Sequence, residues 1–305
     1  MKKKIVTTTA AVLIFFPLLF LSGIEPGSEP SDDWPRRVLI TNDNGIEDPK
    51  IRALATAFAK EAETYVVAPL EDRSGTTHYA PSFQSGALEV EKRDLGPGIH
   101  AYAVDGYPAD CILLAAAGIM KDRLPDLVIS GINGGPNLAE AWIGSGTIGA
   151  ARFAAYAGLP ALAISGLDDD DPEAVRAAVQ WVVRLAKSPV VREMKPGRFL
   201  TVSIPRVHPS EIKGIRVATR AELREVPEFS EVSDAAPGTG RQIWRITGVS
   251  ERDYEPPEDS DVSLYDTGYV VVVPMKADEH DYDLLSLLKL NPGKLPPWSA
   301  DKIKQ

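Results

Sequence analysis

The chain has 305 residues, 44% of them hydrophobic and 25% charged, which is typical of a soluble globular enzyme with a large core. Its formal net charge of −10 excludes a general binder of the nucleic-acid backbone, although one local site can still hold a small phosphorylated ligand. A single cysteine, Cys111, excludes an intrachain disulfide and a cysteine-rich zinc site, and the four histidines lack metal-ligand spacing. Any bound metal therefore needs mainly oxygen ligands, as magnesium, manganese and calcium do.

The first 24 residues have the pattern of a secretory signal. Lysines at positions 2–4 precede an apolar run at 10–21, AAVLIFFPLLFL. We expect residues 1–24 to form a signal peptide, or a signal anchor if the segment is retained, because residues 5–24 can just cross a bilayer. Residues 25–35 are expected to form a polar linker. Export without disulfides favours a periplasmic location.

Strands and helices alternate along residues 36–200, which we interpret as the core of a domain at 36–305. Apolar runs predict strands at 37–41, 64–69, 99–106, 125–131 and 159–165. Helical spacing of apolar residues predicts helices at 49–63, 108–120, 146–158 and 171–187. Because crossovers of this kind form parallel sheets, the pattern predicts an α/β fold, a Rossmann-like three-layer doubly wound sheet.

Residues 201–305 have a different sequence pattern from the core. This pattern predicts a strand-rich C-terminal extension. Strand patterns occur at 198–205, 214–220 and 241–248, separated by stretches rich in proline and charge. A strong apolar strand at 267–275 is a candidate to rejoin the main sheet, and a short helix is predicted at 281–290. We expect the extension to add arms or hairpins for oligomer contacts.

Four polar loops follow predicted strands or precede a predicted helix: TNDNG (41–45), DRSG (72–75), SGINGGPN (130–137) and GSGT (144–147). Ligands of an open parallel sheet bind outside the carboxyl ends of its strands. Each loop alone also has an ordinary interpretation as a turn or a helix cap. Together, however, they offer a carboxylate, amide and hydroxyl oxygens, and many glycine amides.

This set of donors indicates a particular chemistry. A carboxylate with amide and hydroxyl oxygens suits a hard cation. The GSGT amides at the start of a helix suit a phosphate. A divalent metal between them could polarise a phosphoryl oxygen and lower the pKa of a bound water. The sequence therefore favours a metal-dependent phosphomonoesterase.

The loops, in this order and context, resemble the SurE family of 5′/3′-nucleotidases. The resemblance runs from VLITNDNGI through VVAPLEDRSG, GYPADC, PDLVISGINGGPNL and SGTIGAA to EIKGIRV and DTGYVVVVPM, essentially the whole mature chain. It implies hydrolysis of nucleoside monophosphates to nucleoside and phosphate. It also implies one divalent cation per subunit, Mn²⁺ or Mg²⁺, and a homodimer or homotetramer.

The resemblance also implies roles for individual residues. Its metal ligands fall on Asp43, Asn44, Ser74 and Asn133, with Asp43 also catalytic, and its phosphate contacts fall on Asn137, Ser145, Gly146 and Thr147. Asp110 matches the family pattern too, and we expect a structural or capping role there. His78 lies close to the site in sequence; we interpret it as a surface-loop residue, with a substrate contact or an acid as the alternative.

The chain departs from the family at Asn44, where the usual NDDG reads NDNG. An amide oxygen can still bind a hard cation, but the site loses a negative charge, so weaker metal binding is expected. This leaves open a nucleotide- or metal-binding protein with weakened or lost turnover. A haloacid dehalogenase-type phosphatase is excluded because Thr41 replaces the nucleophilic aspartate. A dinucleotide oxidoreductase is disfavoured because no GxGxxG follows the first strand.

Overall fold

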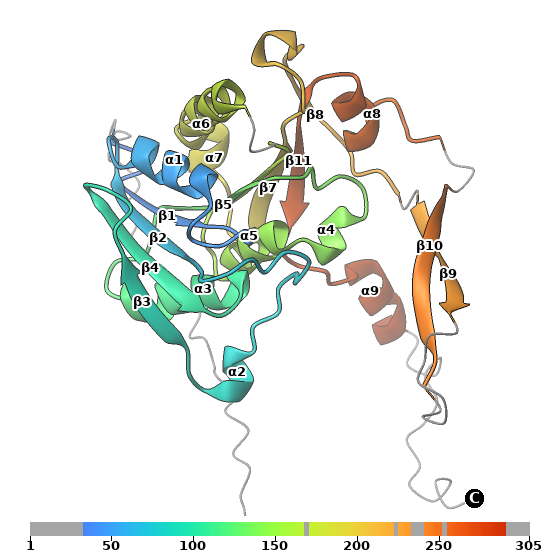
Figure 1. The fold of residues 1–305 in the computed structure, drawn as a ribbon, viewed down its shortest axis with the longest axis horizontal. Coiled ribbons are helices and arrows are strands. Elements are labelled where there is room, and N and C mark those ends of the chain that lie inside the picture. The colour runs from blue at the N-terminus through green and yellow to red at the C-terminus, as the bar shows by residue number, and fades with distance from the viewer. Residues whose placement is uncertain (1–32, 168–170, 223–224, 233–240, 252–254, 291–305) are drawn as a thin grey trace, which may run out of the picture. The chain divides into compact units, whose positions relative to one another are not determined.

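The computed structural model describes residues 33–167, 171–222, 225–232, 241–251 and 255–290 (Figure 1). The expected signal segment at 1–24, the linker up to residue 32 and the acidic stretch at 168–170 lie outside these residues. Within the described part of the chain, no helix is long and apolar enough to span a membrane. Trp34–Gln305 forms a compact unit that carries every helix and strand given below.

One sheet of nine strands organises this unit, in the order β3-β4-β2-β1-β5-β6-β7-β11-β8. Its middle consists of parallel strands: β4 (Ile99–Asp105), β2 (Glu63–Pro69), β1 (Arg37–Thr41), β5 (Leu127–Asn133), β6 (Ala161–Ser165) and β7 (Arg198–Ser203). At one edge, β3 (Glu89–Arg93) pairs antiparallel with β4. The strand order reverses between β1 and β5, which is where an open parallel sheet binds its ligands.

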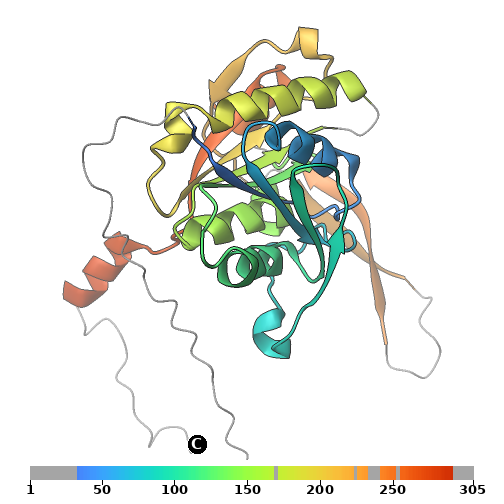
Figure 2. The ribbon, with the colours of Figure 1, turned by 90° about the vertical axis from the view of Figure 1, so that its left-hand side faces the viewer.

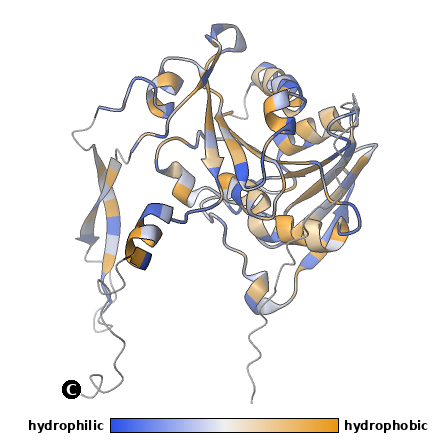
Figure 3. Ribbon diagram, turned by 180° about the vertical axis from the view of Figure 1, so that it is seen from behind, coloured by the Kyte–Doolittle hydropathy of each residue, from blue (hydrophilic) through white to orange (hydrophobic). Residues whose placement is uncertain are grey.

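Helices cover both faces of the sheet, as Figure 2 shows. On one face lie α1 (Pro49–Phe58) and α6 (Pro172–Ala186), and on the other α3 (Pro108–Leu114) and α5 (Gly146–Tyr156). The strands alternate between the two cores: Val38 and Ile40 pack under the first pair of helices, and Leu39 under the second. Hydrophobic residues accordingly run along the central strands in Figure 3. The predicted doubly wound α/β fold is confirmed.

Local signals set the helix starts. Asp48 caps α1, its Oδ1 accepting a hydrogen bond from Lys50 N at 2.7 Å, and Pro49 occupies the first turn. Asp171 caps α6 in the same way. The predicted helix at 108–120 changes geometry part-way, because an α-helix to Leu114 is followed by a π-helical turn at Ala115–Ile119. The short helices are α2 (Ser82–Ser85), α4 (Ala141–Gly144), α7 (Pro189–Arg192) and a 3-10 turn (Pro209–Glu211).

The C-terminal extension both completes the main sheet and adds a hairpin. The strand expected at 267–275 forms β11 (Val270–Lys276), which pairs antiparallel with β7, and β8 (Ile215–Val217) pairs parallel with β11. Strands β9 (Glu225–Val232) and β10 (Ile243–Glu251) form a separate antiparallel sheet. Helix α8 (Asp261–Asp266) precedes β11, and α9 (Tyr282–Leu290) follows it. The interpreted boundary at residue 200 therefore falls inside β7.

Candidate active site

The turn after β1 is a rigid support for Asp43. The buried Asn42 side chain closes the turn, donating from Nδ2 to Gly45 O at 2.8 Å and accepting from Gly45 N at 3.2 Å. Gly45 has φ +99°, and a Cβ there would lie 3.1 Å from the Glu71 carbonyl carbon, so the turn requires glycine. The backbone oxygen of Asp43 accepts from Arg73 N at 2.7 Å, which ties this turn to the DRSG loop.

Asp43 is 2% exposed and faces the start of α5. Its Oδ2 accepts from Thr147 N at 3.0 Å and its Oδ1 from the Thr147 hydroxyl at 2.7 Å. Gly146 packs so closely that a Cβ on it would lie 2.9 Å from Asp43 Oδ2. Burial raises the pKa of Asp43, against the lowering effect of the Thr147 hydrogen bonds, and the charge of Asp72 raises it further. A carboxylate in this environment is stabilised by a neighbouring cation.

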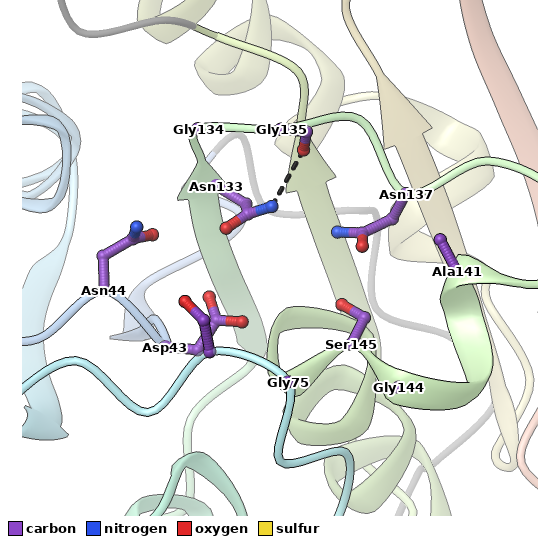
Figure 4. A pocket seen from close by; sticks show the side chains of 11 residues that line it. Asp43, Asn44, Gly75, Asn133, Gly134, Gly135, Asn137, Ala141, Gly144 and Ser145 are labelled. Carbon is purple, nitrogen blue, oxygen red and sulfur yellow. Dashed lines mark hydrogen bonds between the residues drawn. The ribbon is translucent and has the colours of Figure 1, made fainter. Parts of the chain in front are cut away.

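A cavity of about 420 Å³ opens beside Asp43, at the carboxyl ends of β1 and β5 (Figure 4). It collects six of the predicted site residues from separate loops: Asp43, Asn44, Ser74, Asn133, Asn137 and Ser145. The rest of its lining consists of Ala141 and four glycines, which leave backbone groups open to a ligand. The four polar loops that the sequence singled out therefore meet at one place.

Two of the predicted metal ligands are held in orientation by hydrogen bonds. Asp72 Oδ1 accepts from Ser74 N at 2.8 Å and from the Ser74 hydroxyl at 2.6 Å. Asn133 Nδ2 donates to Gly135 O at 2.8 Å, and Figure 4 shows the oxygen of this amide on the side of Asp43. Asp72 was not among the predicted site residues. Its position two residues before Ser74, the spacing of an Asx turn, is the signal that could have revealed it.

The residues around Asp43 fit a hard divalent cation. Asn44 Oδ1 is buried and has no hydrogen-bond partner in the described structure, and a buried oxygen in this state calls for a ligand. A carboxylate, two amide oxygens and a hydroxyl form a donor set that suits magnesium, manganese or calcium. Within the described ranges, no cluster of three or more His, Cys, Asp and Glu side chains could hold a metal. A cation here would thus rely largely on uncharged oxygens.

Asn137 and Ser145, the residue that caps α5, line another part of the cavity. Ser145 caps the helix, its hydroxyl accepting from Ile148 N at 3.1 Å. Asn137 is 8% exposed, and its Nδ2 donates to the Ser165 hydroxyl at 2.7 Å. Amides at a helix N-terminus carry partial positive charge and attract anions. This side of the cavity can therefore hold a phosphate group.

Two predicted phosphate contacts do not line the cavity. Gly146 lies against Asp43, and both donors of Thr147 are engaged by the Asp43 carboxylate. The structure thus gives Thr147 a second role, the orientation of Asp43, that the sequence did not indicate. A direct phosphate contact from either residue stays a prediction.

The other residues singled out have simpler roles. Asp110 is fully buried and caps the start of α3, accepting from Tyr107 N at 3.1 Å. It also accepts from the Ser82 hydroxyl at 2.5 Å, so the expected capping role is confirmed. His78 is exposed, and its Nδ1 lies 3.0 Å from the Thr77 hydroxyl.

Comparison with known proteins identifies the family. The family model described as Survival protein SurE matches residues 38–226. The chain is 36% identical over 251 residues to 5′-nucleotidase SurE of Cytophaga hutchinsonii, covering 82% of this chain and 95% of that protein. It is 38% identical over 244 residues to 5′/3′-nucleotidase SurE of Cronobacter sakazakii, covering 79% and 90%.

A solved structure agrees with these sequence matches. The SurE protein from Aquifex aeolicus superimposes with a TM-score of 0.68 at 28% identity, covering 83% of this chain and 98% of that one. The fold, the loops and the relatives therefore point the same way, and the chain belongs to the SurE family.

Proposed function

We propose that the protein is a metal-dependent 5′/3′-nucleotidase, a phosphomonoesterase that hydrolyses nucleoside monophosphates to nucleoside and phosphate. Relatives that match along four fifths of the chain carry the names 5′-nucleotidase and 5′/3′-nucleotidase. The observation that carries the proposal is the cavity itself. It brings a buried carboxylate and uncharged oxygens together beside a helix N-terminus.

Each side of the cavity has a separate task in this reaction. Asp43, Asn44, Ser74 and Asn133 would hold the cation, which when bound supplies the charge that polarises a phosphoryl oxygen and acidifies a water. Thr147 and Gly146 fix the Asp43 carboxylate in place before substrate arrives. Asn137 and Ser145, which line the cavity beside the start of α5, would orient the phosphate oxygens.

The proposal also includes the bound cation, the oligomeric state and the location, and each of these rests on a separate observation. One cation per subunit, Mn²⁺ or Mg²⁺, suits the group of oxygen donors that lines the cavity. A homodimer or homotetramer is supported by the β9–β10 hairpin, where Phe229, Trp244 and Ile246 are each more than half exposed. Location in the periplasm rests on the N-terminal sequence pattern.

The alternative of a binding protein without turnover is not favoured, because the relatives are named as nucleotidases. Asn44 still lines the cavity, with its side-chain oxygen buried. We expect the substitution from the family's aspartate to change metal affinity rather than to remove activity.

Phosphate release from AMP, GMP and p-nitrophenyl phosphate tests the function. The assay uses purified protein with Mn²⁺ or Mg²⁺, with EDTA as the metal-free condition and Asp43→Ala as the inactive reference. Asp278→Ala, which removes an exposed carboxylate, is the matched control and should behave as wild type. Wild-type release that is no higher than that of Asp43→Ala, or that EDTA does not abolish, would overturn the proposal.

A further inference from the structure

The segment at 134–140 forms one wall of the cavity but contains neither strand nor helix. Such a segment keeps one conformation only when groups elsewhere satisfy its backbone amides and carbonyls. Three side chains of the C-terminal extension do so. The first is Arg206, whose Nη2 donates to Gly134 O at 2.7 Å. The other two are Arg220 and Asp261.

Arg220 donates hydrogen bonds to four groups, one of them Met275 Sδ at 3.8 Å from Nη2. Its side chain is 14% exposed, and Nη1 donates to Asn137 O at 2.8 Å and to Asp261 Oδ2 at 3.1 Å. Its Nη2 donates to the Thr201 hydroxyl at 2.8 Å. Because Thr201 belongs to β7, the guanidinium joins the cavity wall to the central sheet.

Asp261, the first residue of α8, is fully buried and accepts four hydrogen bonds. Besides the bond from Arg220, its Oδ2 accepts from Ala139 N at 2.9 Å. Its Oδ1 accepts from Ala221 N at 2.9 Å and from Val262 N at 3.0 Å. The backbone is therefore held on both sides of residue 138, by Arg220 at Asn137 and by Asp261 at Ala139.

Apolar packing reinforces this arrangement. Leu138 packs against a small cluster formed by Ala139, Ala221 and Val262. It also packs against Val271 and its neighbours on β11. Buried ion pairs are costly to desolvate and often stabilise less than apolar residues of the same volume. A buried pair that binds the backbone of a cavity wall therefore suggests a task other than stability.

We propose that the Arg220–Asp261 pair positions Asn137 for the substrate phosphate, so that the C-terminal extension is part of the active site. The pair fixes the Asn137 backbone, and the Ser165 hydroxyl then sets the direction of its amide. The inference rests on the proposed function, because Asn137 contacts the phosphate only if the cavity binds one. Arg220 and Asp261 act through Asn137 and do not themselves line the cavity.

A double-mutant cycle separates positioning from general stability. The substitution Arg220→Lys keeps the charge but cannot reach Asn137 O, Asp261 and Thr201 together. We expect it to lower kcat/KM for AMP about 10- to 100-fold, since small displacements of a positioning group have effects of this size. In an Asn137→Ala background, where the positioned amide is absent, the same substitution should lower kcat/KM by less than about threefold.

Arg37→Lys is the matched control. Arg37 is 6% exposed, pairs with Glu63 at 2.9 Å and donates to Arg123 O at 2.9 Å, but it lies at the amino end of β1, away from the cavity. Its replacement should lower the melting temperature and leave kcat/KM unchanged. If Arg220→Lys does not fold, Asp261→Asn, which conserves the volume, replaces it in the cycle.

The outcomes of these experiments distinguish the positioning role of Arg220 and Asp261 from the nucleotidase function. Equal losses for Arg220→Lys in both backgrounds, or a loss matched by Arg37→Lys, would overturn the positioning role while the nucleotidase function stands. Calorimetric titration measures the affinity of the same site for inorganic phosphate without turnover. We expect this affinity to fall in Arg220→Lys but not in Arg37→Lys. A wild type that binds phosphate and hydrolyses no nucleotide would overturn the function, and the titration would still decide the positioning role.

Discussion

The two sides of the cavity are built in different ways. On the Asp43 side, most supporting hydrogen bonds join residues two or three apart, as in Asn42 with Gly45, Asp72 with Ser74 and Asn133 with Gly135. On the Asn137 side, the support comes from Arg220 and Asp261, 83 and 122 residues away from the groups that they bind. The side proposed to hold the cation (the cation side) is thus largely fixed by local turns, whereas the side proposed to hold the phosphate (the phosphate side) depends on the complete fold.

The largest effect is expected from a substitution of Asp43, on the cation side of the cavity. Asp43→Asn removes the one carboxylate among the predicted ligands while keeping its shape. The amide oxygen can still accept from Thr147 N, and the amide nitrogen can donate to the Thr147 hydroxyl oxygen. We expect metal-dependent AMP hydrolysis to fall by more than about 100-fold, because loss of a ligand should exceed the 10- to 100-fold effect typical of its supporting groups. Retention of a tenth of wild-type activity would contradict this role for Asp43.

A smaller effect is expected when the support of Ser74 is removed. Asp72→Asn weakens the acceptor that holds both the amide and the hydroxyl of Ser74. We expect Mn²⁺ affinity, measured by calorimetry, to fall about 10-fold. Asp105→Asn is the control, because Asp105 pairs with Arg73 on the same loop without contacting Ser74. Equal losses in the two variants would show that Asp72 acts only through general charge.

Asn44→Asp should strengthen the cation side. It restores a second carboxylate where the side-chain oxygen of Asn44 is buried without a partner. Because the number of charged ligands tunes the affinity for hard cations, we expect Mn²⁺ binding to tighten about 10-fold. The same calorimetric titration checks this, and unchanged affinity would show that Asn44 does not contact the cation.

The smallest expected effect concerns stability without metal. Since burial raises the pKa of Asp43, this group favours the folded state below the ordinary aspartate pKa of about 3.9, and that contribution is lost as the pH rises through the raised folded pKa. In EDTA, Asp43→Asn should therefore melt above wild type at pH 7, and the difference should shrink as the pH falls toward the ordinary aspartate pKa. Thermal melts across this range check the prediction, and a variant less stable at pH 7 would refute it.

The same contrast explains what the sequence could predict. The strand ends and the TNDNG, DRSG and SGINGGPN loops have local signatures, so the fold and the cation side were accessible from the residues and from the family resemblance. Strand β3 was missed because EVEKR is a charged, almost wholly exposed edge strand without apolar alternation. Arg220 and Asp261 were missed because isolated charged residues in a charged segment look like surface positions until the fold buries them.

Thr147 shows the limit of transferring roles by motif. The GSGT motif predicted a phosphate contact, and the helix N-terminus does face the cavity through Ser145. The Thr147 side chain instead turns to the Asp43 carboxylate, 104 positions earlier in the chain. Only the meeting of β1 and α5 in the folded protein reveals this pairing.

The most direct test is the initial rate of phosphate release from AMP as a function of Mn²⁺ concentration, for wild type and Asp43→Asn. We predict a saturable rise from zero in the wild type and a rate near zero at every concentration in the variant. A wild-type rate that does not depend on Mn²⁺ or Mg²⁺, or a variant that follows the wild-type curve, would contradict a metal-dependent nucleotidase centred on Asp43.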